Sequence, residues 1–396
     1  MMEKLQPKLR FPEFTNNEEI KNYSFNDLFS FSTGKNIKQN EASPEFDIPC
    51  VRYGELYHMY NEVIKNIVNS THLPSSDLVF SEGNEILLPS AGEDPLDIGS
   101  ASALTLPNVA IGRTINILRP LKKDVYSQLF TSYYINHRLR KKISSLAKGV
   151  SISNVYNSDL KTLEILLPSL PEQQKIASFL TTVDDKISNL KQKVSLLEKY
   201  KKGVMQQIFS LQIRFKDTAG NDFPEWEEKS LGEVCDVKKG EQFNKEDLKE
   251  TDLYPCINGG IEPSGYSHLY NRNENTITIS EGGNSCGFIN FIKTKFWCGG
   301  HCYTIELKNS NFNIDYLFQL LKSYQNEIMK LRVGSGLPNI QKKDLSSFNF
   351  ELSVNIEEQT KIAEFLTGID EKIETTKLQL SKMVVWKKGL IQGMFC

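Results

Sequence analysis

Two stretches of this sequence are nearly the same: "EQQKIASFL" at residues 172–180 and "EQTKIAEFL" at residues 358–366. The similarity continues without a gap from residues 172–209 to residues 358–395 at a constant offset of 186 (358 − 172), with about 18 identities in 38 positions. Self-similarity of this length indicates an internal duplication. The chain therefore carries one element twice, and the unrelated sequence between the copies belongs to other parts of the fold.

Apolar residues in both copies recur at alternating steps of three and four, which is the pattern of a coiled-coil seam. We expect the helices to pair through the seam residues Leu180, Val183, Ile187, Leu190, Val194, Leu197, Leu366, Ile369, Ile373, Leu380 and Met383. Thr376 is polar where a seam residue is expected, and both copies place a lysine, Lys201 and Lys387, at the same seam position. A shared polar residue in a seam can fix register and pairing partner; equally, the lysine stems can extend out of the seam.

Each copy also has the start signal of a helix. Ser169 precedes Glu172 by three residues, and Asn355 precedes Glu358 by three, which is the spacing of a capping box. We predict long helices at residues 169–211 and 355–396, and about 38 residues at 1.5 Å each span roughly 57 Å. Two near-identical seams in one chain are at high effective concentration, which favours an antiparallel pair. In the alternative arrangement each helix packs separately on its own domain.

The sequence outside these helices forms two blocks, residues 1–168 and 212–354, that we predict to be compact domains. Runs of β-branched and aromatic residues such as "NTITISEGG" end in turns, and each block holds one stretch with apolar residues at helical spacing. The blocks barely align, yet "LRFPEF" opens the first while "IRF" and "DFPEW" open the second. The expected fold class is α+β, with two globular domains joined by two long antiparallel coiled-coil helices in a pseudo-twofold internal repeat.

The amino-acid composition favours a globular protein over a membrane-spanning one. The chain of 396 residues is 39% hydrophobic and 24% charged, as in globular proteins of two or more domains, and no run of about 18 apolar residues is present to span a membrane. The start lacks the apolar core of a signal peptide and the seven cysteines are scattered, so we expect a cytoplasmic protein with reduced thiols. "CGGHC" at residues 298–302 matches no common zinc spacing, so no metal site is assigned.

The repeated segment "LPSLPEQQKIASFL" to "KKGVMQQIF", its second copy and the "LRFPEF" opening together resemble the specificity subunit of type I restriction-modification systems. The resemblance covers essentially the whole chain and is strongest in the two helices. It implies that each block is a target-recognition domain that reads one half of a split, asymmetric sequence in double-stranded DNA. The helices would hold the two domains at a set distance and dock other subunits.

The resemblance also implies partners and cofactors. The partners would be two modification subunits, which are methyltransferases, and two restriction subunits, which are ATP-dependent translocases and endonucleases. S-adenosylmethionine, ATP and Mg²⁺ would bind to those partners, so this chain itself would hold no cofactor, and no membrane would be involved. The net charge of −2 gives the chain no general attraction for a polyanion, so the partners would supply phosphate contacts.

Base readout needs forked donors or acceptors at groove edges, while phosphates take lysines, hydroxyls and backbone amides. Loops of the first block offer as DNA-binding candidates Lys35, Asn36, Lys38, Arg52, Tyr53, Ser90, Lys148, Ser151, Ser153 and Asn154. Loops of the second block offer Lys238, Lys239, Gln242, Asn258, Ser280, Asn284, Ser335, Asn339, Lys342 and Lys343. For each of these residues the alternative, which is the more common case, is an ordinary solvated loop residue. Arg113, in "IGRT", is a further candidate, with a structural salt bridge as the alternative.

No catalytic residues are assigned. An amino-methyltransferase needs an Asn/Asp-Pro-Pro-aromatic site, and "DPLD" at Asp94 lacks the second proline and the aromatic residue. "TGKN" lacks the upstream glycine spacing and the Ser/Thr of a phosphate loop. The sequence thus predicts a non-catalytic DNA-recognition subunit of a methyltransferase and endonuclease complex. Two alternatives stay open: a non-catalytic coiled-coil scaffold whose blocks bind protein partners, and a self-sufficient restriction enzyme.

Overall fold

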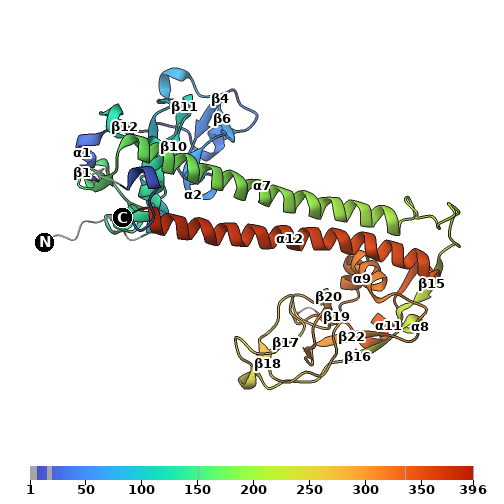
Figure 1. The fold of residues 1–396 in the computed structure, drawn as a ribbon. Coiled ribbons are helices and arrows are strands. Elements are labelled where there is room, and N and C mark those ends of the chain that lie inside the picture. The colour runs from blue at the N-terminus through green and yellow to red at the C-terminus, as the bar shows by residue number, and fades with distance from the viewer. Residues whose placement is uncertain (1–6, 16–19, 150, 335, 396) are drawn as a thin grey trace. The chain divides into compact units, whose positions relative to one another are not determined.

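The computed structural model describes residues 7–15, 20–149, 151–334 and 336–395. It confirms the two long helices, α7 (Leu170–Phe209) and α12 (Ile356–Met394), and the mixed α and β structure of the blocks (Figure 1). The chain divides into two compact units: unit 1 comprises Met1–Leu190 with Gln379–Cys396, and unit 2 comprises Lys191–Leu378. Each unit therefore combines one block with a part of both long helices.

The block of unit 1 contains two five-stranded sheets. The first has the strand order β2 (Phe29–Thr33), β12 (Ile115–Pro120), β8 (Glu85–Pro89), β10 (Ser102–Leu104), β5 (Val63–Ile64). The second has the order β3 (Ala42–Ser43), β6 (Asn69–Thr71), β4 (Ile48–Val51), β11 (Pro107–Ile111), β7 (Phe80–Glu82). Two short pairs are β1 (Lys21–Ser24) with β14 (Glu164–Leu167), and β9 (Ala91–Gly92) with β13 (Ser153–Asn154). Its short helices are α1 (Phe25–Leu28), α2 (Tyr53–His58), α3 (Pro95–Ile98), α4 (Gln128–Tyr134), α5 (Arg140–Ser145) and α6 (Asn157–Leu160).

The block of unit 2 contains a four-stranded and a three-stranded sheet. The first has the order β16 (Cys235–Lys239), β22 (Cys302–Leu307), β19 (Thr276–Ser280), β20 (Ile289–Ile292). The second has the order β18 (Tyr266–Ser267), β17 (Tyr254–Ile257), β21 (Trp297–Cys298). One short pair is β15 (Glu227–Ser230) with β23 (Asn349–Leu352). Its short helices are α8 (Leu231–Val234), α9 (Ile314–Ser323), α10 (Gln325–Lys330) and α11 (Lys342–Ser346).

The two blocks share a common core of strands, although the sheets of unit 1 have additional strands and the two sequences barely align. In each block a strand and a one-turn helix lead into the first sheet, as β1, α1 and β2 in unit 1 and as β15, α8 and β16 in unit 2. The order β2, β12, β8, β10 corresponds to β16, β22, β19, β20, with antiparallel neighbours in both. In the second sheet β4 runs parallel to β11, as β17 does to β21. The duplication therefore extends through the blocks as well as the helices.

The seam residues of both long helices lie in or beside the domain cores. The core of unit 1 contains from α7 and α12 the buried residues Leu180, Val183, Ile187, Leu390 and Met394, with Leu380 and Met383 partly buried beside it. The core of unit 2 contains Leu366, Ile369, Ile373, Met205 and Ile208, with Leu197 partly buried beside it. Leu190 is buried and Val194 is half-buried. In each unit the start of one long helix thus meets the end of the other, which is the predicted antiparallel arrangement, and each helix start also packs on its own domain.

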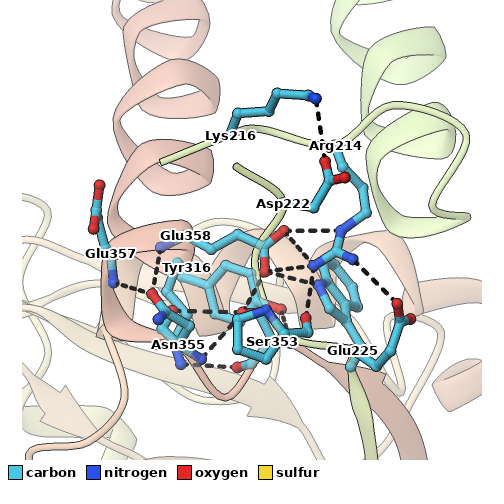
Figure 2. A network of polar contacts seen from close by, with 12 residues as sticks. Arg214, Lys216, Asp222, Glu225, Tyr316, Ser353, Asn355, Glu357 and Glu358 are labelled. Atoms are coloured by element: carbon cyan, nitrogen blue, oxygen red, sulfur yellow. Dashed lines mark hydrogen bonds and ion pairs between the residues drawn. The ribbon is translucent and has the colours of Figure 1, made fainter. Parts of the chain in front are cut away.

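The repeated glutamate at each helix start is a buried carboxylate that binds an arginine from the opening of the same block. In unit 1, Nε and Nη2 of Arg10 donate to the two carboxylate oxygens of Glu172 at 2.6 Å each, and Glu172 is 1% exposed. In unit 2, Arg214 donates to Glu358 from Nε at 3.2 Å and from Nη2 at 3.1 Å (Figure 2). Such charge-assisted, forked pairs are among the strongest polar contacts in proteins. The "LRFPEF" and "IRF" openings correspond because each supplies this arginine.

Further donors complete the site around Glu358. Nε1 of Trp226 donates to Glu358 Oε2 at 3.0 Å. The Ser353 hydroxyl donates to the same oxygen at 2.6 Å (Figure 2). Burying a carboxylate is costly unless its lone pairs are filled by such donors. The start of α12 is thereby tied to three different segments of its own block.

The repeated glutamine that follows each glutamate holds the cap of a domain helix. Gln173 Oε1 accepts from the backbone amide of Ser127, the N-cap residue of α4, at 2.9 Å. Gln359 Oε1 accepts from the amide of Asn313, the N-cap residue of α9, at 2.8 Å. Both glutamine side chains are fully buried, so their hydrogen bonds are not exchanged with water. The Glu-Gln pair of the repeat therefore joins each long helix to its own block through buried hydrogen bonds.

The capping box predicted at each helix start is wrong for the glutamate in both copies, and in unit 1 it is wrong for the serine as well. Asn355 Oδ1 does accept from the amides of Glu357 and Glu358, at 2.9 and 3.1 Å, as a capping residue should (Figure 2). The glutamate, however, turns to its arginine in both copies, because a guanidinium attracts a buried carboxylate more strongly than a backbone amide does. Among the described residues the buried Ser169 hydroxyl has no hydrogen-bond partner.

Two glycines mark where the two sheets of a block approach each other. A Cβ atom placed on Gly34, just after β2, would lie 2.0 Å from the carbonyl oxygen of Gly112. A Cβ atom on Gly240, just after β16, would lie 2.2 Å from the carbonyl oxygen of Gly299. These distances are far inside van der Waals contact, so glycine is required at both places.

We predict that Arg214→Met destabilises unit 2 by about 3–5 kcal/mol, because it leaves the buried Glu358 carboxylate without its counter-charge. Lys216→Met is the matched control, since Lys216 pairs with Asp222 at 3.5 Å on an exposed surface, and that change should cost less than about 1 kcal/mol. Urea unfolding followed by tryptophan fluorescence measures both. Equal losses for the two variants would contradict a structural role for the buried pair.

We predict that Gly34→Ala costs about 1–3 kcal/mol of stability, because the new methyl group overpacks the contact with Gly112. The control is Gly203→Ala inside α7, where a Cβ would meet nothing within 4 Å and alanine should add about 0.5–1 kcal/mol of helix stability. Thermal unfolding by circular dichroism gives both values. A Gly34→Ala protein as stable as wild type would refute the close approach.

Candidate nucleic-acid interface

The loops that follow the core strands are joined by the same backbone hydrogen bonds in both units. In unit 1 the amide of Lys35 donates to Ile111 O at 3.0 Å, and that of Gly112 donates to Val51 O at 2.8 Å. In unit 2 the corresponding bonds run from Glu241 to Cys298 O at 2.9 Å and from Gly299 to Ile257 O at 2.8 Å. The loops predicted from sequence as DNA-binding therefore lie together in each unit.

A second set of bonds joins the remaining loops in the same way. The amide of Ser90 donates to Thr114 O at 2.8 Å, and the amide of Val155 donates to Ser90 O at 2.9 Å. In unit 2 Glu281 donates to His301 O at 2.9 Å, and Ile340 donates to Glu281 O at 2.8 Å. Backbone bonds of this kind do not depend on side-chain identity, so one frame can display different side chains in the two units.

The loops before Val155 and Ile340 have matching hairpin geometry. Lys148 exchanges backbone hydrogen bonds with Asn154 at 2.9 and 2.8 Å, and Val333 does so with Asn339 at 2.8 and 3.0 Å. Ile152 and Leu337, in these loops, are 57% and 85% exposed, and the sequence reasoning missed both. The predicted "SISN" and "SGLPN" loops thus correspond in structure, although Ser335 itself lies outside the described residues.

In unit 1 four candidate residues line one hollow of about 400 Å³: Lys38, Arg52, Tyr53 and Arg113. Arg52 is held in place because its Nε donates at 2.9 Å to Glu55, a carboxylate that also accepts from Asn69 Nδ2. Arg113 and Tyr53 are exposed. Two guanidinium groups, an ammonium and an aromatic ring in one concave surface are suited to base edges and phosphates.

The loops around this hollow contain non-glycine residues in the left-handed backbone region. Asn36, Ile37 and Thr114 have φ values of 49°, 54° and 67°. Each such residue costs about 1–3 kcal/mol, and β-branched residues are rare there. Ile37 is buried, and the Asn36 side chain donates to Asp77 O at 2.7 Å, so tertiary contacts hold the loop in this shape. A recognition loop held in one conformation loses little entropy on binding.

In unit 2 a hollow of about 570 Å³ is lined by Lys238, Tyr270, Asn271, Arg272, Asn273, Thr276 and Glu306. Of these residues, Lys238 was predicted from the sequence to bind DNA. The "YNRN" run at residues 270–273 was not. An arginine flanked by asparagines and a tyrosine in a turn is the signal that could have found it. Arg272 Nη2 donates to Lys239 O at 3.1 Å, which brings this run next to a predicted loop.

Several of the predicted DNA-binding residues are buried or form ion pairs within the protein. Ser280 is 3% exposed and its hydroxyl donates to Gly259 O at 2.5 Å, and Ser153 is 7% exposed, so burial argues against a DNA contact for either. Lys148, Lys238 and Lys239 pair with Asp159, Glu306 and Glu281 at 2.8, 2.5 and 2.7 Å. Exposed ion pairs are weak, so these lysines can exchange their partners for phosphate.

The other candidates differ in exposure. Those that are exposed are Lys35, Asn36, Lys38, Ser151, Gln242, Asn284, Asn339, Lys342 and Lys343. Ser90, Asn154 and Asn258 are half-buried, and Asn258 Oδ1 accepts from the amide of His301 at 3.1 Å. DNA contact by any of these side chains stays a prediction.

The cysteines of the described chain are core residues. Burial raises the pKa of the Cys50 and Cys235 thiols to about 12 and that of Cys256 to about 11, so they are neutral at physiological pH. Cys298 and Cys302 of the "CGGHC" stretch are buried too. Among the described residues no group of three possible ligands is placed to hold a metal ion. None of the described helices is both long enough and apolar enough to cross a bilayer.

The sequence matches a family model described as the type I restriction modification DNA specificity domain twice, at residues 17–199 and 224–384. A putative type I specificity subunit of Mycoplasma genitalium is 26% identical over 285 residues, which cover 71% of this chain and 73% of the relative. The MjaVIII type I restriction enzyme specificity subunit of Methanocaldococcus jannaschii is 24% identical over 305 residues, which cover 68% of this chain and 71% of the relative.

Solved structures have the same fold. The crystal structure of a type I restriction-modification S subunit from M. genitalium superposes with a TM-score of 0.74 at 22% identity and covers 99% of both chains. A chain from a structural study of the assembly and conformational transition of a type I restriction-modification system has a TM-score of 0.52 at 16% identity, with 95% of this chain and 96% of that chain covered. Because its two units both match the DNA specificity domain, this chain belongs to the specificity-subunit family of type I restriction-modification systems.

Proposed function

We propose that this chain is the non-catalytic subunit that reads a split, asymmetric DNA target, with each unit contacting one half-site. The observation that carries the proposal is the common loop frame: the same backbone bonds recur in both units while the side chains on them differ, as with Arg113 against Gly300. Loops with the same backbone arrangement but different hydrogen-bonding side chains are suited to reading two different short DNA sequences in the same manner.

The spacing between the half-sites would be set by the two long helices. Both are continuous over 40 and 39 residues, which corresponds to roughly 60 Å of helix at 1.5 Å per residue. DNA rises about 3.4 Å per base pair on each strand, so a separation of tens of ångströms leaves on the order of one helical turn unread. This is the role that the family resemblance implies for the helices.

Partner docking is supported by one exposed aromatic surface in each unit. In unit 1 Trp386 is 48% exposed and its ring contacts Phe179 with centroids 5.9 Å apart. At the repeat-related positions of unit 2, Tyr200 is 54% exposed and Phe365 is 38% exposed. Exposed aromatic residues of this kind are typical of interface anchors. Two equivalent surfaces fit two copies of one partner, which we assign to two modification subunits.

Chemistry in the proposed complex belongs to the partners. The modification subunits would bind S-adenosylmethionine and methylate adenine, and two restriction subunits would use ATP and Mg²⁺ for translocation and cleavage. With a net charge of −2, this chain alone should bind DNA weakly and with strong salt dependence, since phosphate neutralisation dominates affinity. Tight specific binding by the isolated chain at physiological salt would argue against this division of roles.

We predict that Arg113→Ala relaxes recognition at the first half-site and leaves the second unchanged, with a loss of about 1–3 kcal/mol of base discrimination. Adenine-methylation mapping of cells that express the variant with its modification subunit measures the motif. Gln242→Ala should act on the second half-site alone, and Lys193→Ala, on the exposed surface of α7, should change neither. Equal loss at both half-sites after Arg113→Ala would contradict the assignment of one half-site to each unit.

We predict that Trp386→Asp and Tyr200→Asp each remove one modification subunit from the complex, and that the double variant removes both. A buried charge in place of an aromatic anchor should weaken binding by about 2 kcal/mol or more, roughly 30-fold. Native mass spectrometry near the dissociation constant gives the stoichiometry. Gln192→Asp, at an exposed polar position of α7, is the control. Retention of two partners by the double variant would show that docking uses another surface.

A further inference from the structure

Two ion pairs between the long helices are related by the internal repeat. In unit 1 Lys387 Nζ of α12 lies 2.6 Å from Asp184 Oδ1 of α7. In unit 2 Lys201 Nζ of α7 lies 2.7 Å from both carboxylate oxygens of Asp370 on α12. The offset of 186 relates the aspartates (370 − 184) and the lysines (387 − 201) alike. The seam lysines noted in the sequence therefore have partners, and those partners are repeated too.

These pairs are only partly accessible to water. The lysine side chains are 17% and 14% exposed, and the aspartates 24% and 33%. A half-buried pair is screened less than a surface pair, and removing one partner leaves a charge that the surroundings must solvate. Each ion pair is therefore sensitive to the position of the opposite helix.

Each aspartate also binds a helix of its own recognition block. The Tyr133 hydroxyl of α4 donates to Asp184 Oδ2 at 2.5 Å, and Gln319 Nε2 of α9 donates to Asp370 Oδ2 at 2.8 Å. Because α4 and α9 are the helices whose caps are held by Gln173 and Gln359, the same domain element is fixed at two points. Asp184 and Asp370 are thus three-way junctions between α7, α12 and a recognition block.

The junction of unit 1 carries one more acidic group. Glu62, in the loop between α2 and β5, has both carboxylate oxygens 3.4 Å from Lys387 Nζ, and it contacts His137 Nε2 at 2.9 Å. Burial alone would raise the pKa of Glu62, but the hydrogen bond from His137 and the charge of Lys387 outweigh burial and lower that pKa to about 2. Glu62 therefore stays charged at neutral pH and adds a second link from Lys387 to the block.

The apolar seam cannot perform this positioning by itself. Hydrophobic contact is non-directional, and the two seams are nearly identical, so sliding the helices past each other or pairing them in parallel would still bury apolar surface. In a parallel in-register pair the repeat-related positions would face one another, which would place Asp184 opposite Asp370 and Lys201 opposite Lys387. Polar residues at seam positions are the usual means by which coiled coils reject such alternatives.

We infer that the Asp184–Lys387 and Lys201–Asp370 junctions fix the register of α7 against α12 and couple that register to the seating of each recognition block. On the proposed function, on which this inference rests, both aspartates are positioning residues that set how strictly the gap between half-sites is measured. Because both carboxylates are already engaged by a lysine and by a helix of the block, the bases read in each half-site should not depend on them.

The test is a gap-length series with the assembled complex. Targets carrying the wild-type half-sites with the wild-type gap, or with one base pair more or less, are methylated by the wild-type complex and by the Asp184→Asn/Asp370→Asn variant. We expect the preference for the correct gap to fall at least tenfold in the variant with the half-sites unchanged. A neighbouring repeat-related pair provides the control, Lys186→Gln/Lys372→Gln, since both side chains are exposed on the same helices. Unchanged gap preference in the junction variant would overturn the inference.

A charge exchange separates positioning from simple loss of stability. Asp370→Lys alone should lose gap preference, because it places two ammonium groups together, and adding Lys201→Asp should restore it. Gln319 can serve either charge, since its amide has both a donor and an acceptor. Failure of the exchange to improve on the single variant would also overturn the inference. If the wild-type complex methylates no split target, the proposed function fails instead, so the two failures are distinguishable.

Discussion

A buried carboxylate at the start of each long helix is the constraint on which the architecture depends. Glu172 and Glu358 are almost completely inaccessible to water, and each requires an arginine that comes from the opening of the same block. Because an unpaired charge in such a place would be strongly destabilising, the helix and the block have to fold together. The glutamine next to each glutamate accepts a hydrogen bond from the N-cap residue of a domain helix, so it too joins the long helix to the block. The repeated Glu-Gln pair is therefore what makes each block and its helix one unit.

In both blocks the backbone holds the loops in place and the side chains are displayed on them. This explains how the two blocks could differ in sequence and keep a similar fold. The loops of both units are joined by main-chain bonds at corresponding places, and glycines at 34 and 240 allow the sheets to approach closely. Neither device constrains the exposed side chains of the loops. Selection can thus change what a unit displays to DNA while the frame that presents it persists. The Asp–Lys junctions apply the same principle to the helices, since they position the blocks and leave the displayed residues free.

Much of the fold could be predicted from sequence because it is encoded periodically. The seam from Leu180 to Ile187 and its repeat from Leu366 to Ile373 predict long paired helices, since burial of a stripe repeats every three or four residues. Contacts between segments distant in sequence have no such signal. The capping-box interpretation of Glu172 and Glu358 was wrong in its second half, since the arginines that bind them lie 162 and 144 residues away. The burial of Ser280 and the place of Arg272 in a hollow depend likewise on how strands stack, which spacing along the chain does not reveal.

On the proposed function, this chain alone determines which DNA sequence is modified. The most direct test of this role is adenine-methylation mapping by long-read sequencing in a methylation-free host, comparing the chain expressed with its modification subunit against the modification subunit alone. We expect a new methylated motif of two half-sites separated by a fixed gap, present only when the chain is expressed. If the modification subunit is bound and intact and no such motif appears, or if the same motif appears without this chain, then this chain does not determine the modified sequence.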